Sequence, residues 1–116
     1  MPNYVAAPRP PLDAVFFALS DSTRRSVLEK LGQGPTPVGE LAKSFPMALP
    51  SFLQHLRVLE SSSLVSSHKV GRVRTYQLAP QPMQQVQSWL SAQKALWEKR
   101  LDRLDHFLLT AKEPSP

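Results

Sequence analysis

The 116-residue chain contains no cysteine. This absence excludes disulfide bonds, thiolate metal ligands, cysteine nucleophiles and thiol redox switches. Long hydrophobic runs are also absent, because no stretch approaches the roughly 18 apolar residues that a membrane-spanning helix needs. The first twenty residues lack the layout of a signal peptide. We therefore expect a soluble, cytoplasmic protein that has no membrane partner.

Glycine is scarce as well. The four glycines lie at positions 32, 34, 39 and 71, with neither GxGxxG nor phosphate-loop spacing. Titratable side chains are scattered over different predicted elements, so no set of nucleophile, base and acid emerges. These features predict that the chain is not an enzyme and uses no cofactor.

Acidic residues are almost missing from the central third of the chain. The net charge is +5, and residues 43–76 account for +4 of it, because Glu60 alone opposes five basic side chains. Those five are Lys43, Arg57, Lys69, Arg72 and Arg74. A basic patch confined to one region suggests a polyanionic partner, and nucleic acid before a membrane. The alternative is a solvated face on which basic residues cluster by chance.

Apolar residues at helical spacing predict two helices at the start of the chain. The first begins at Leu12 and ends near Leu19. Ser20 or Asp21 is expected to cap the second helix, and the GQGP stretch at 32–35 ends it.

Two further helices follow. Thr36 is expected to cap a short third helix that has Pro37 as its first residue. The fourth helix is expected to run from Pro50 to about Ser62. Its apolar side consists of Phe52, Leu56 and Leu59, and its polar arc of Ser51, Gln54, His55 and Arg57.

The stretch LVSSHKVGRVRTYQL, residues 64–78, changes to a period of two across a Val70-Gly71 turn. This alternation predicts a two-stranded hairpin. Because an isolated hairpin is only marginally stable, we expect Leu64, Tyr76 and Leu78 to pack on the helices.

A final helix is predicted from 82 to 110. It would be about 43 Å long, whereas a domain of this size has a radius of gyration of only about 13 Å. Such a long, broadly apolar helix needs a partner surface, most simply the same helix of a second copy. The expected dimer contacts are Phe16, Leu90, Trp97, Leu101, Leu104 and Leu108.

The order of these elements is that of a winged helix-turn-helix, a mainly α fold with a small β-hairpin wing (α+β). We predict a flexible Pro-rich arm at 1–11, a DNA-binding core at 12–79, a dimerisation helix at 80–110 and a flexible tail at 111–116. The fourth helix would enter the major groove, which accepts one helix. Base edges would then be contacted by Ser51, Gln54 and His55, and a phosphate by Arg57. The DNA backbone or the adjacent minor groove would be contacted by the wing residues Lys69, Arg72 and Arg74.

Five blocks of the chain, in order, resemble the ArsR family of bacterial transcriptional repressors: FALSDSTRRSVLEKL, VGELAKSF, SFLQHLRVLESSSLV, GRVRTYQL and WEKRLDRLDHFL. The resemblance covers about residues 12–110. It implies a homodimer that binds an inverted-repeat operator in double-stranded DNA and represses a small operon. It also implies that the helix over 50–60 is the recognition helix and that GRVRTYQL forms the second strand of the wing.

Three positions depart from the family pattern. Met47-Ala48 stands where Met-Ser is common, so the usual serine cap of the recognition helix is missing. Leu53 stands where a DNA-contacting serine is common, and either contacts a thymine methyl group or marks a different operator. Ser63 replaces the usual glycine before the hairpin.

The family's metal sites need either cysteines or an Asp-x-His pair followed by further ligands. The last helix here offers Asp102, Asp105 and His106, which we interpret as a solvated acidic turn among basic residues, and no metal is predicted. An inducer, if one exists, would be organic or would act at the dimer interface near Trp89 and Trp97. The alternative function is a winged-helix protein–protein interaction module without sequence-specific DNA binding.

Overall fold

The computed structural model describes residues 12–112 and divides between Gln85 and Val86 into two units. The predicted arm at 1–11 and most of the predicted tail lie outside the described residues. Among residues 12–112, no helix combines the length and the apolar character that crossing a membrane requires.

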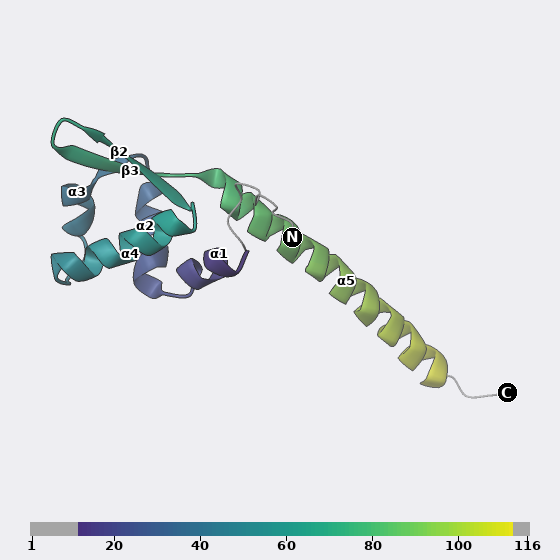
Figure 1. Ribbon diagram of the computed structural model, residues 1–116. Coiled ribbons are helices and arrows are strands. Elements are labelled where there is room, and N and C mark those ends of the chain that lie inside the picture. Colours follow the sequence, from purple (N-terminus) through teal and green to yellow (C-terminus); the bar gives the residue numbers. More distant parts are fainter. Residues whose placement is uncertain (1–11, 113–116) are drawn as a thin grey trace, which may run out of the picture. The chain divides into compact units, whose positions relative to one another are not determined.

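The elements follow the predicted order, with one additional strand (Figure 1). Their bounds are α1 (Leu12–Leu19), α2 (Ser22–Leu31), β1 (Thr36–Pro37), α3 (Val38–Ala42), α4 (Leu49–Ser61), β2 (Val65–Val70), β3 (Val73–Leu78) and α5 (Pro80–Lys112). Helix α5 begins in the first unit and supplies every described residue of the second. The winged helix-turn-helix fold expected from the sequence is thereby confirmed.

The core of the first unit forms where α1 and α2 contact each other and both contact α4. Strand β2 lies against α4, and β3 lies against α2 and α3 (Figure 1). The predicted apolar side of α4 is buried, since Phe52, Leu56 and Leu59 are each at most 1% exposed. The other buried apolar side chains of this unit are Val15, Ala18, Val27, Leu31, Leu41, Leu64, Val65, Tyr76 and Pro82.

The wing is a three-stranded antiparallel sheet in the order β1-β3-β2, not a hairpin alone. Thr36 pairs with Tyr76, so the prediction of Thr36 as a helix cap is wrong. A residue before proline favours extended backbone, which suits Thr36 to a strand, and proline is tolerated at a sheet edge. Pro37 is the N-cap of α3 rather than its first residue, and no side chain caps that helix.

The hairpin turn lies one residue later than predicted. Val70 pairs with Val73, which leaves Gly71 and Arg72 as the two turn residues. Gly71 has a φ of 64°, and glycine at the first turn position is typical of a type II′ hairpin turn. Leu64 and Tyr76 are buried as expected, whereas Leu78 is 40% exposed. Its side chain lines an apolar cavity together with residues of α2 and α5.

Helix α4 ends in a left-handed residue. Ser63 has a φ of 63°, and it is the only residue other than glycine with positive φ among residues 12–112. The amide of Leu64 donates to the carbonyl of Leu59 over 3.1 Å, and the amide of Ser63 donates to that of Glu60 over 2.9 Å. This pair of bonds is the Schellman motif, in which glycine usually occupies the left-handed position.

We expect Ser63→Gly to raise the free energy of unfolding by about 1 kcal/mol, because glycine adopts this backbone without the steric cost that a Cβ imposes. Urea denaturation at fixed protein concentration measures the change. Ser61→Gly, in the last turn of α4, is the matched control and should lower stability by a similar amount. Equal effects of the two substitutions would contradict the assignment of strain to Ser63.

Candidate nucleic-acid interface

Helix α4 is held firmly by its buried side. The ring of Phe52 stacks on that of Phe45, which follows α3, with 5.1 Å between ring centroids. The opposite side of α4 presents Ser51, Gln54 and Arg57, all of them exposed. The polar arc predicted from the sequence is therefore fully exposed at three of its four positions and partly buried at His55.

Gln54 and Arg57 interact with each other. Nη1 of Arg57 donates to Oε1 of Gln54 over 2.6 Å. This bond leaves the amide NH₂ of Gln54 and the rest of the guanidinium as outward donors. Bidentate pairing of Gln54 with adenine uses both its oxygen and its nitrogen. The amide oxygen has two lone pairs, so it could accept from adenine while Arg57 still donates to it.

The N-terminus of α4 lacks a side-chain cap. Ala48 is the N-cap residue, as the missing serine implied, and it has no side chain that accepts a hydrogen bond. Pro50 lies in the first turn, where its missing N–H costs nothing because that donor would have no intrahelical partner.

Basic residues gather at the tip of the wing. Lys69 lies directly opposite Arg74 in the β2–β3 register, and Arg72 occupies the turn. Like charges in opposite positions of a hairpin are destabilising. This arrangement is unfavourable in the free protein and favours an anionic partner.

The wing is joined to α4 by a chain of hydrogen bonds. Arg74 donates to Oγ of Ser67 over 2.9 Å, and Ser67 donates to Oε2 of Glu60 over 2.8 Å. Burial raises the pKa of the Tyr76 hydroxyl, and the charge of Glu60 raises it further. The single carboxylate of residues 43–76 is thus engaged inside the unit.

His55 differs from the other residues of the arc, because its side chain is only 23% exposed. Its Nδ1 atom lies 3.1 Å from Nη1 of Arg24 and 3.7 Å from Oδ2 of Asp21. Asp21 caps α2 by accepting from the amide of Arg24 over 3.0 Å, which confirms one of the two predicted caps. Ser20 instead donates to the carbonyl of Phe17.

Arg24 is the residue that the sequence interpretation missed. It is 7% exposed, its Nε donates to the carbonyl of Ala18 over 2.8 Å, and its Nη2 donates to that of Phe17 over 3.0 Å. The guanidinium also lies 5.0 Å from the centroid of the Phe17 ring. A charged residue next to a helix cap is normally expected at the surface. The hydrophobic periodicity of the sequence therefore did not indicate that Arg24 is buried.

The residues predicted at a dimer interface are exposed in the single chain, from 37% for Phe16 to 59% for Trp97. The others are Leu90, Leu101, Leu104 and Leu108. No group of three or more potential metal ligands occurs within residues 12–112, and this range includes Asp102, Asp105 and His106.

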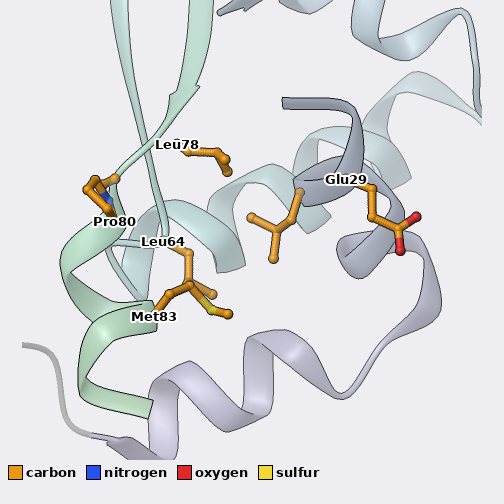
Figure 2. A pocket seen from close by; sticks show the side chains of 7 residues that line it. Glu29, Leu64, Leu78, Pro80 and Met83 are labelled. Atoms are coloured by element: carbon orange, nitrogen blue, oxygen red, sulfur yellow. The ribbon is translucent and has the colours of Figure 1, made fainter. Parts of the chain in front are cut away.

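A cavity of about 350 Å³ lies in the first unit, between α2, the end of β3 and the start of α5. Its lining is apolar except for Glu29, whose carboxylate is turned away from Leu78 and Met83 (Figure 2). The remaining lining residues are Leu28, Leu64, Ala79 and Pro80. Its volume lies within the range of small-molecule pockets, roughly 300–1,000 Å³.

The known proteins that the chain resembles are helix-turn-helix proteins and transcriptional regulators. A family described as "Helix-turn-helix domain" matches residues 19–68. The chain is 46% identical over 68 residues to the HTH-type transcriptional regulator Rv2034 of Mycobacterium tuberculosis, covering 59% of this chain and 64% of that relative. The chain therefore spans just under two thirds of that protein's length.

In two further comparisons the matched region covers most of the other protein's length. The transcriptional repressor SdpR of Bacillus subtilis is 33% identical over 79 residues, which cover 68% of this chain and 88% of SdpR. The crystal structure of an ArsR family transcriptional regulator superposes with a TM-score of 0.72 at 50% identity, covering 75% of this chain and 90% of that one.

We expect Asp21→Ala to lower the free energy of unfolding by about 1 kcal/mol, because α2 loses its cap. Asp21→Asn should keep the cap and serves as the matched control. The hydrogen bond from the Arg24 amide, together with the charges of His55 and Arg24, holds the pKa of Asp21 below its ordinary 3.8. The stabilisation due to the carboxylate is therefore present above pH 3.8 and is lost as the pH falls through the lowered pKa.

Urea denaturation at pH 7 and at pH 3 measures this dependence. Any stability advantage of the wild type over Asp21→Asn should shrink at the lower pH. An advantage that grows as the pH falls would contradict the assigned direction.

Proposed function

Because this chain belongs to the ArsR family of transcriptional regulators, we propose that it is a homodimer that binds an inverted-repeat DNA operator and represses a small operon. The observation that carries this proposal is a helix anchored by its buried side and bordered by a basic wing. Helix α4 presents Ser51, Gln54 and Arg57 outward, and the wing adds Lys69, Arg72 and Arg74. We propose that the chain has no enzymatic activity, in keeping with its family.

We assign sequence reading to α4 and sequence-independent affinity to the wing. Gln54 would pair with a base edge, and Ser51 would add a further contact. Arg57 and the basic wing residues would bind phosphates, a contribution that weakens as salt displaces them.

The second copy is proposed to bind along α5. Leu90, Trp97, Leu101, Leu104 and Leu108 repeat at steps of three, four or seven residues, and each is between 46% and 59% exposed. Such spacing gives one continuous apolar stripe, as on helices that pair in coiled coils. Pairing of two recognition helices would match the two-fold symmetry of an inverted repeat.

A protein–protein interaction module is the second candidate, and the exposed apolar side chains of α5 favour it. That function does not explain why Lys69 lies opposite Arg74, because a neutral protein surface would not offset this repulsion. The cytoplasmic location and the absence of a bound metal stay predictions, as does the organic nature of an inducer, if one exists. The apolar cavity next to Leu78 and Met83 offers an alternative place for such an inducer to that near Trp89 and Trp97.

We expect Gln54→Ala to weaken binding to the cognate promoter by about 1–3 kcal/mol and to relax discrimination at one base position. Arg72→Ala should weaken binding to all sequences alike and flatten the salt dependence by about one unit of slope. Binding of promoter and scrambled duplexes across a salt series measures both effects.

Lys30→Ala is the matched control for Arg72→Ala, because it removes the same charge from the exposed last turn of α2. It should leave both the affinity and the salt slope close to the wild type. Equal binding of the wild type to promoter and scrambled DNA would refute sequence-specific binding.

We expect the double variant Leu101→Ala with Leu104→Ala to dissociate the dimer and to lose operator binding, because it removes two central side chains of the stripe. Sedimentation velocity measures the oligomeric state. Lys99→Ala with Arg103→Ala, on the other side of α5, is the control and should sediment as the wild type. A monomeric wild type that still protects a two-fold-symmetric site would contradict this assignment.

A further inference from the structure

The contact between Arg24 and His55 determines which ring nitrogen of the histidine carries a proton. Nη1 of Arg24 lies 3.1 Å from Nδ1 of His55. A guanidinium has five donors and no acceptor, so Nδ1 must be the acceptor. In the neutral ring, the proton then resides on Nε2.

The tautomer that carries its proton on Nδ1 fits the geometry less well. A donor on Nδ1 would have to reach Oδ2 of Asp21 at 3.7 Å, which is beyond hydrogen-bond distance. It would also face a guanidinium that cannot turn away, because Arg24 is fixed by its bonds to the carbonyls of Phe17 and Ala18. Asp21 in turn accepts from the Arg24 amide and is held in place.

Nε2 of His55 reaches solvent. It makes no hydrogen bond within residues 12–112, and in that range no buried side-chain nitrogen or oxygen lacks a partner. The ring lies on the same side of α4 as Ser51, one turn earlier, which is exposed. A single N–H donor of fixed direction therefore stands within the proposed reading surface.

We propose that His55 is a specificity-determining residue that acts only as a hydrogen-bond donor, reading an acceptor atom on a base edge, with purine N7 as the target. Arg24 and Asp21 are its positioning residues. The amino groups of adenine and cytosine are donors and cannot satisfy Nε2–H. This inference rests on the proposed function, because it requires α4 to enter the major groove.

The first test needs no DNA. Long-range ¹H–¹⁵N correlation spectra of the full ¹⁵N-histidine-labelled chain, at mildly alkaline pH, distinguish a bare ring nitrogen from a protonated one. We expect a bare Nδ1 and a protonated Nε2 for His55, assigned by comparison with His55→Gln. A protonated Nδ1 would overturn the inference.

Two isosteric variants separate reading from scaffolding. His55→Asn places an amide oxygen near the Nδ1 position, so it can still accept from Arg24 but reaches no base. His55→Gln places an amide NH₂ near the Nε2 position and keeps a donor toward the base. We expect Asn to retain stability yet lose about tenfold in discrimination at one base pair, and Gln to retain more of that discrimination. A merely structural histidine would give full discrimination with Asn.

The third test uses the wild type alone, so it does not depend on any variant folding. Replacing single purines of the promoter by 7-deazapurines should weaken binding about tenfold at one position in each half-site, and His55→Asn should be insensitive there. A loss caused only by methylphosphonate substitution would show that His55 binds a phosphate and would overturn base reading. If the wild type does not prefer its promoter but the spectra show Nε2–H, the proposed function fails while the tautomer assignment holds.

Discussion

The buried guanidinium of Arg24 is the contact on which the arrangement of the first unit depends. It binds the last carbonyls of α1 through Ala18 and Phe17, its backbone amide is capped by Asp21, and it reaches His55 on α4. A hydrogen bond to a charged group contributes about 1.5–3 kcal/mol, so loss of any of these acceptors would leave part of a buried guanidinium unsatisfied. One side chain thereby fixes three helices relative to one another, and apolar packing alone would leave their rotation less constrained.

Much of this fold follows from residue pattern. The five helices, the buried side of α4 and the alternation of β2 and β3 were predictable because each shows a repeat of about 3.6 or 2 residues. Strand β1 was not predicted, because a strand of two residues is too short to show a repeat. The turn was placed one residue too early, because Val70 and Val73 are the same residue type and the sequence does not show that they pair. The departure at Ser63 was visible as a missing glycine, but its left-handed backbone was not.

The reading surface was predictable only in part. Exposure of Ser51, Gln54 and Arg57 follows from the burial of Phe52, Leu56 and Leu59 on the same helix. The orientation and tautomer of the His55 ring do not follow from this pattern, because they depend on Arg24, which lies 31 positions earlier. A contact of such long range leaves no trace in local periodicity, and the bond between Arg57 and Gln54 depends on side-chain rotamers that sequence does not fix.

The electrostatic arrangement of α4 differs from that of the wing. In α4, Arg57 donates to Gln54 and His55 is held by Arg24, so the proposed base contacts would be made by donors whose direction is already fixed. In the wing, Lys69 and Arg74 are placed in direct opposition at a cost of roughly 0.2–1 kcal/mol. The bonds from Arg74 through Ser67 to Glu60 join this repulsive tip to α4. A polyanion bound at the tip would relieve this repulsion, so the proposed affinity of the wing and the proposed base reading by α4 rest on different residues.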